Sequence, residues 1–376
     1  MNVLFIGPYR QQDEWGRKSR AILKSLQRTQ HNITARPIFL SSSTQYDTYQ
    51  EIAEHNISNT NSYDILIQFL LQPYAVYNGS ITKNIGIFNS ETLPAQVPIA
   101  QLTKELLMDE IWTESDSIQQ RLQQVLQDHT NNTKVVAIPP SLDVENLSTT
   151  PSVSIKSSHP DLANKFIFYY IGNPMDDKDA FKETLIAYSK AFCYQDEVCL
   201  IVFSDIAIPQ EKIESVLKEC TELMHDVRPP TQKPMIKFLM PPNGVWSTEE
   251  RVALHIEGDC LVAPSYSLSA TSTVLEAGLY NSTPIINKGN AAFECLTEEN
   301  SWGIESYEDI CMYKTRPLNS RFTSNELWRK PIVHSLSATM KTCFFDKFKR
   351  DEKIKANSQL RSYFSNMSYE NLLNKG

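Results

Sequence analysis

Short apolar runs alternate with amphipathic segments along most of this chain. In the first half, residues 3–6, 64–69 and 110–113 are apolar enough to form buried strands. Residues 16–27 carry alanine, isoleucine and leucine side chains on one side of an expected helix. Short strands that alternate with helices are typical of a parallel, doubly wound α/β sheet.

The same alternation returns after a polar stretch rich in serine, threonine and proline, beginning with a strand at residues 166–171. We therefore predict two Rossmann-like domains, residues 1–148 and 163–345, joined by a linker at residues 149–162. Residues 346–376 are expected to form a separate C-terminal helix. Ligands bind such sheets at the carboxyl ends of their strands, so two facing halves predict a cleft between them.

The composition is that of a globular protein, with 376 residues of which 41% are hydrophobic and 21% are charged. No apolar run reaches the roughly 18 residues needed to span a bilayer. Residues 1–7 lack the basic region of a signal peptide and are interpreted as a first strand. The seven cysteines are odd in number and form no C-x-x-C pair, which predicts neither a disulfide framework nor a zinc site. We expect a protein of the reducing cytoplasm.

The charge distribution argues weakly against a nucleic-acid binder, because the formal net charge is −8 and such binders are usually basic. Basic residues nevertheless cluster in two places. The C-terminal cluster is interpreted as solvated helix faces. The N-terminal cluster lies beside the first loop, and it leaves a nucleic-acid acceptor open as an alternative; its members are Arg10, Arg17, Lys18, Arg20, Lys24 and Arg28.

The main candidate site is a strand, a loop of small and hydroxyl residues, and the start of a helix. Residues 258–265 are expected to form the strand, and residues 274–280 the helix. Free backbone N–H groups and the helix dipole make such a helix start a phosphate site. Glu276 lies one turn inside the helix, where its carboxylate can reach a sugar or ribose hydroxyl. The pattern predicts a site for a nucleotide-linked or phosphorylated sugar.

Several segments in order resemble the GT-B retaining glycosyltransferases, especially the GT4-like group. This resemblance implies a nucleotide-diphosphate sugar donor as substrate, no cofactor, and transfer to a glycan, lipid-linked or other acceptor with retention of configuration. It also implies a C-terminal helix that crosses back to the first domain. No metal is required, and no aspartate-rich metal motif is present. The matching segments are residues 8–20, 85–94, 108–115, 138–143, 170–172, 178, 180–192, 253–265, 275–277 and 284–286.

The resemblance assigns roles to particular residues. Lys178 and Glu276 are the expected catalytic residues, Lys178 as a cation for the leaving diphosphate. The sequence departs from the family at Leu268, where a first glutamate is usual, and at Asn173, where an arginine is frequent. The expected donor-binding residues are Gly172, Asn173, Ser269, Ala270, Thr271 and Ser272, and those of the acceptor side or cleft are Gly16, Arg17, Arg20 and Glu91.

The departures leave alternatives open. One is a catalytically degenerate sugar-nucleotide-binding or assembly subunit, which the missing arginine and glutamate favour. Another is a glycosyltransferase that acts on a modified nucleic-acid base. A sugar-phosphate enzyme such as an epimerase would need acid and base groups in the cleft, and none is identified. His255 lies on an apolar helix stretch and is interpreted as a core residue.

Overall fold

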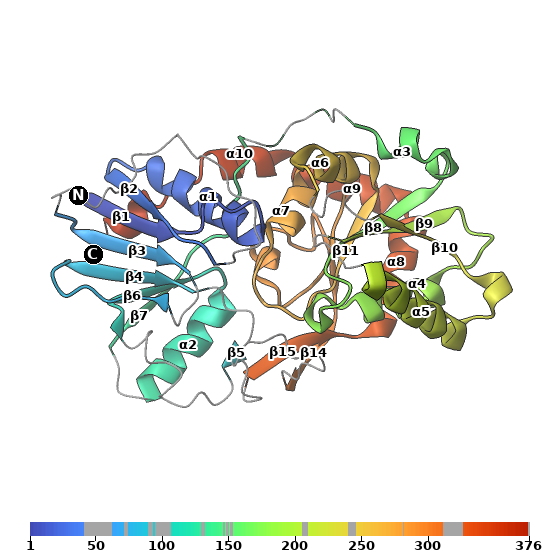
Figure 1. The fold of residues 1–376 in the computed structure, drawn as a ribbon, viewed down its shortest axis with the longest axis horizontal. Helices are drawn as coiled ribbons and strands as arrows, with labels where there is room; N and C mark the ends of the chain where they lie inside the picture. The colour runs from blue at the N-terminus through green and yellow to red at the C-terminus, as the bar shows by residue number, and fades with distance from the viewer. Residues whose placement is uncertain are drawn as a thin grey trace.

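The structure is a computed structural model. It describes residues 1–40, 62–70, 74–88, 93–94, 107–128, 132–145, 147, 150, 153–204, 210–239, 246–280, 282–310 and 326–374. Two α/β lobes lie side by side, the N-terminal lobe in blue and cyan and the C-terminal lobe from green to orange (Figure 1).

The N-terminal lobe is built on a six-stranded parallel sheet with the order β2-β1-β3-β4-β6-β7. Helix α1, Glu14–Gln27, follows the first strand, and α2, Asp116–Asp128, follows β6. The buried central strands explain the apolar runs of the sequence, because a parallel sheet is covered on both faces. The strands are β1 Asn2–Gly7, β2 Asn32–Pro37, β3 Ile65–Phe69, β4 Lys83–Ile87, β6 Glu110–Thr113 and β7 Lys134–Ala137.

The C-terminal lobe repeats this architecture with the order β10-β9-β8-β11-β12-β13. In β8, Ile167 and Tyr169 enter one core while Phe168 and Tyr170 enter another, so the sheet is buried on both faces. The strands are β8 Phe166–Gly172, β9 Val198–Ser204, β10 Met235–Leu239, β11 Cys260–Ala263, β12 Ile285–Asn287 and β13 Trp302–Ile304. The predicted pair of doubly wound parallel-sheet domains is therefore confirmed.

Helices surround this second sheet, and the helix predicted at residues 274–280 is present as α7. The α-helices are α4 Phe181–Ala191, α5 Gln210–Val227, α6 Thr248–Glu257, α7 Ser272–Leu279, α8 Val333–Phe345 and α9 Lys347–Ala356. The short 3₁₀ segments are η5 Asp177–Asp179, η6 Pro230–Gln232 and η7 Ala291–Glu294.

A small antiparallel sheet, which the sequence pattern did not predict, joins the lobes at their lower edge (Figure 1). Strand β15, Glu326–Pro331, pairs with β14, Ser306–Ile310, in the C-terminal half. Its other edge pairs with β5, Leu93–Pro94, from the N-terminal half. Two residues of β5 carry too little periodicity to be recognised as a strand.

The predicted linker contains a single helical turn, α3 Ile155–Ser158, followed by η4 Pro160–Leu162. The Ser154 hydroxyl caps α3, and the Lys156 N–H donates to Glu257 of α6 at 2.8 Å. The polar composition that predicts a linker thus also supplies the cap of this turn. The exact domain boundaries stay a prediction.

The prediction of a single C-terminal helix is wrong, because α9 is followed by η8 Asn357–Gln359, α10 Leu360–Ser365 and α11 Glu370–Leu373. The side chain of Asn357 donates to the Asn300 carbonyl at 3.2 Å, and the chain turns there. Beyond α10, the ring of Tyr369 packs edge-on against Trp112 of the N-terminal lobe, with ring centroids 5.6 Å apart. Separate short helices let the segment contact both lobes.

Two observations concern the chain as a whole. No helix in the described part of the chain is long and apolar enough to cross a membrane. The six cysteines within the described ranges are all free thiols.

Candidate functional site

The loop between β11 and α7, residues 264–271, has its shape fixed by side chains from the next strand. The Asn290 amide donates to the carbonyls of Ser267 and Ser269 at 2.9 and 3.0 Å. The Asn287 amide donates to the Ser265 carbonyl at 2.6 Å. Two asparagines, one at the end of β12 and one just beyond it, thus preorganise the loop, and the sequence did not predict this role.

Helix α7 begins at the end of this loop, as the sequence predicted. Thr271 is its N-cap, and the threonine hydroxyl accepts the Val274 N–H at 3.3 Å. Four of the six predicted donor-binding residues, Ser269, Ala270, Thr271 and Ser272, lie at this helix start. The positive end of the helix dipole therefore faces the N-terminal lobe, whose Glu14 accepts the Ser272 N–H.

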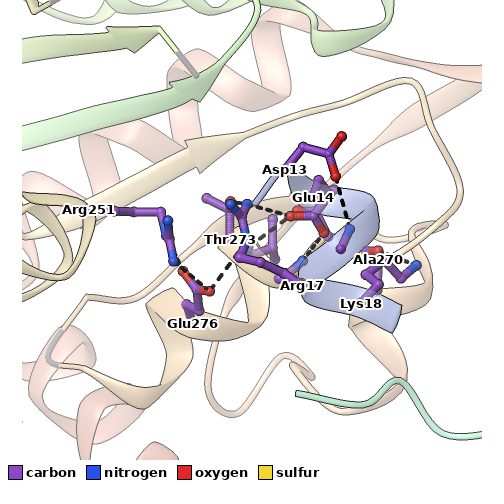
Figure 2. Close-up of polar contacts among 12 residues, drawn as sticks. Asp13, Glu14, Arg17, Lys18, Arg251, Ala270, Thr273 and Glu276 are labelled. Atoms are coloured by element: carbon purple, nitrogen blue, oxygen red, sulfur yellow. Dashed lines mark hydrogen bonds and ion pairs between the residues drawn. The ribbon is translucent and has the colours of Figure 1, made fainter. Parts of the chain in front are cut away.

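Glu276 is buried, with 2% of its side chain exposed, and both of its carboxylate oxygens face arginine (Figure 2). Arg251 of α6 donates through Nε to Oε2 at 2.8 Å and through Nη2 to Oε1 at 3.4 Å. Arg17 of the N-terminal lobe brings its Nε to 3.8 Å from Oε1. The sequence identified Glu276 and Arg17 but missed Arg251, which lies on a separate helix. Whether Glu276 binds a sugar hydroxyl stays a prediction.

The electrostatics around Glu276 keep the carboxylate ionised. Burial opposes ionisation, yet the charges of Arg251 and Arg17 and the ring of His255 hold the pKa of Glu276 well below its ordinary value. Burial lowers the pKa of His255, although Glu276 opposes that effect. Because both pKa values are depressed, folded-state stability falls as the pH drops below about 6.5 for His255 and about 4.3 for Glu276.

His255 is buried in the core, as its apolar neighbours in the sequence indicated, but it also borders the site. Its Nδ1 lies 2.8 Å from the Tyr169 hydroxyl, and its Nε2 lies 3.5 Å from Oε2 of Glu276. The Tyr169 hydroxyl in turn donates to Ser282 at 2.8 Å. The floor of the site is therefore a polar network that reaches into the C-terminal lobe.

Helix α1 brings three charged side chains across to the start of α7 (Figure 2). The Ser272 N–H donates to Oε1 of Glu14 at 2.5 Å. Arg17 donates to Oε2 of Glu14 at 2.6 Å and to the Thr273 hydroxyl at 3.3 Å. Lys18 donates to the Ala270 carbonyl at 3.0 Å. Of these three α1 residues, the sequence analysis named only Arg17 as a site residue.

Gly16 and Arg20, predicted on the acceptor side, both brace the first loop. A Cβ atom on Gly16 would lie 1.8 Å from the Gln11 carbonyl oxygen, so only glycine fits. Arg20 donates to the carbonyls of Tyr9 and Gln11 at 2.8 and 2.6 Å. Contact of either residue with a substrate stays a prediction.

Lys178 lies in η5, beside the end of β8 where Gly172 and Asn173 are found. Its carbonyl accepts the Tyr266 N–H at 2.7 Å and so anchors the β11–α7 loop. Its Nζ lies 3.9 Å from Asp176, and the side chain is 28% exposed. The backbone of Asn173 is held by Asp179 at 2.9 Å. The remaining predicted residue, Glu91, lies outside the described residues.

A small cavity of about 10 Å³, room for a single water molecule, lies between the lobes. Lys18 and Glu114, which are 2.5 Å apart, lie on its wall together with Ser269 of the C-terminal lobe. The other lining residues are apolar and belong to the N-terminal lobe: Phe69, Ile87, Phe88, Trp112 and Ile118.

Several solved structures share this architecture. The N-terminal domain of Candida albicans trehalose-6-phosphate phosphatase aligns with a TM-score of 0.64 and 12% identity, over 100% of this chain and 97% of that one. HepE of Anabaena, solved with UDP and glucose, gives 0.62 and 12% over 100% and 98%. The chain has the GT-B fold.

A third structure with the GT-B fold is the sucrose-phosphate synthase of Thermosynechococcus elongatus, with a TM-score of 0.61 and 11% identity over 100% and 97% of the two chains. No protein-family model matches this chain, and no curated protein matches it in sequence. The likeness is therefore one of fold.

Proposed function

We propose that the protein is a glycosyltransferase that moves a sugar from a nucleotide-diphosphate donor, a UDP-sugar, to an acceptor hydroxyl with retention of configuration. One observation carries the proposal: the start of α7 holds an anion, the Glu14 carboxylate, at the boundary between the lobes. The fold supports it, because HepE binds UDP and glucose within the same architecture. Retention follows from the resemblance to GT4-like enzymes.

The residues of the candidate site divide the work. The backbone N–H groups of residues 269–272 hold the diphosphate, and Lys178 places a positive charge near the leaving oxygen. Fixed donors and charges of this kind stabilise the negative charge that develops as the glycosidic bond breaks, so no metal is required. The N-terminal lobe receives a carbohydrate or lipid-linked acceptor on its side of the site.

A second candidate is a subunit that binds a sugar nucleotide without transferring the sugar. The geometry of Glu276 favours it, because both carboxylate oxygens already face arginine. Leu268 is buried where the family usually has its first glutamate, and Asn173 supplies no charge.

Donor hydrolysis and donor binding together separate these candidates. We expect wild-type protein to hydrolyse a UDP-sugar slowly, and Lys178→Ala to reduce that rate by about 10²–10³, as for loss of one charge-stabilising group. Lys218→Ala is the matched control, since Lys218 is 78% exposed on α5. Binding without hydrolysis or transfer supports the second candidate. If the wild-type protein neither binds nor hydrolyses any nucleotide sugar, both candidate functions are refuted.

A further inference from the structure

The start of α7 is already engaged by a carboxylate from the other lobe. Glu14 lies 258 positions away in the sequence, yet its Oε1 accepts the Ser272 N–H at 2.5 Å. Its Oε2 accepts a hydrogen bond from Arg17 at 2.6 Å. A backbone N–H at a helix start and a guanidinium both bind phosphate oxygens well. Glu14 thus stands where a phosphate group would be bound.

The donors at this position exceed what one carboxylate uses. The Ser272 hydroxyl is buried, with 1% of the residue exposed, and no described residue offers it a hydrogen bond. Arg17 also reaches the Thr273 hydroxyl, so its guanidinium spans the first turn of α7. A phosphate carries more acceptor oxygens than a carboxylate, and it can engage the hydroxyl as well as the N–H and the guanidinium.

We propose that Glu14 is a built-in competitor of the donor diphosphate, and that Arg17 passes from Glu14 to the diphosphate when the nucleotide binds. The inference rests on the proposed function, whose phosphate site it uses. Arg17 then supplies, from the opposite lobe, the second positive charge that Asn173 lacks. Donor binding also replaces the contact of Glu14 with the start of α7 by a contact of Arg17 with the bound diphosphate. Donor affinity is therefore coupled to the packing of α1 against α7.

The competing explanation is that Glu14 only caps α7 and joins the lobes. A cap contributes stability, and its removal would leave anion affinity unchanged or lower it. A competitor that is removed raises anion affinity, because the site no longer has to release a bound carboxylate and its negative charge is gone. Anion affinity therefore separates the two roles, whereas melting temperature alone does not.

The experiment is calorimetric titration of the full chain with inorganic pyrophosphate, and separately with UDP. We expect Glu14→Gln to bind pyrophosphate about tenfold more tightly than wild type, in the usual range for coupled sites. Glu145→Gln is the matched control: it removes an equal charge, and Glu145 also pairs with α1, with Lys24 at 2.9 Å and Arg28 at 3.0 Å, at the other end of the helix. Its pyrophosphate affinity should equal that of wild type.

Two further variants keep the result decisive. Arg17→Gln and Ser272→Ala each remove a donor and should weaken pyrophosphate binding at least fivefold, in the same range. Glu14→Ala replaces Glu14→Gln if the latter does not fold.

Equal pyrophosphate affinity of wild type and the Glu14 variants overturns the inference, as does a complete lack of pyrophosphate binding. Tighter pyrophosphate binding without any UDP or UDP-sugar binding supports the inference and refutes the proposed function. Normal UDP-sugar turnover together with unchanged pyrophosphate affinity in Glu14→Gln supports the proposed function and refutes the inference.

Discussion

Glu276 illustrates how much of this site is decided by single side chains. Its carboxylate is buried, and it is tolerated there because Arg251 and Arg17 compensate its charge. A buried ion pair of this kind adds little net stability, but breaking it leaves an uncompensated charge in the core. The pair therefore fixes geometry at the floor of the site more than it stabilises the fold.

We expect Arg251→Ala to lower the free energy of unfolding by about 3–5 kcal/mol, because Glu276 would stay buried without its closest partner. Chemical denaturation followed by fluorescence measures this. The double variant Arg251→Met/Glu276→Leu should recover most of the loss, since it removes both charges. Arg121→Ala, at an exposed position on α2, should change stability by no more than about 0.5 kcal/mol. If Arg251→Ala lowered the free energy of unfolding no more than Arg121→Ala, Arg251 would not be the residue that compensates the buried charge of Glu276.

Helix α1 is the element on which the candidate site depends most. Its N-terminal turn carries Glu14, Arg17 and Lys18 to the C-terminal lobe, and Asp13 caps it by accepting the Gly16 N–H at 3.0 Å. The direction of this turn is set by the first loop, which packs against Gly16 without room for a side chain.

Gly16→Ala should displace the first loop, because the added methyl group would overlap the Gln11 carbonyl. We expect a stability loss of about 1–3 kcal/mol, as for other overpacked sites. Thermal melting measures the loss, and hydrogen exchange should show faster exchange in residues 9–16. Gly79→Ala is the control: its Cβ would meet only Tyr77, at 3.8 Å. Similar melting temperatures for the two variants would show that the close approach is not required.

Among the described residues, the contacts that join the lobes include the α1–α7 contact, the β5–β15 pairing and the C-terminal segment. Arg28 donates to the carbonyls of Phe364 and Met367, both at 3.2 Å, and Tyr369 lies buried against Trp112. The end of the chain is thus part of the core of the N-terminal lobe, although it follows the C-terminal lobe in sequence.

Tyr369→Ala should therefore destabilise the N-terminal lobe by about 3–5 kcal/mol, the usual cost of removing a large buried aromatic side chain. We expect a separate, earlier melting transition in differential scanning calorimetry. Tyr194→Ala removes the same group from an exposed position, 59% exposed, and should leave the melting profile unchanged. A single unshifted transition in Tyr369→Ala would show that the segment is not integral to that lobe.

The sequence by itself determined both sheets, most of their helices and the start of α7, because these follow from local periodicity and from a loop of small residues. It also located Glu276, Arg17 and residues 269–272. The prediction of a single C-terminal helix was wrong. The segment is divided into short helices, and its side chains Asn357 and Tyr369 contact Asn300 and Trp112.

Only the tertiary structure decided which charges meet. Arg251 reaches Glu276, and Glu14 reaches Ser272, through packing between elements that lie far apart in the chain. No local sequence pattern predicts such pairs. A glutamate in the first turn of a helix, such as Glu14, gives the same pattern whether its carboxylate faces water or another helix. The β5–β15 pairing escaped for a similar reason: a two-residue strand is defined by its partner, not by its own residues.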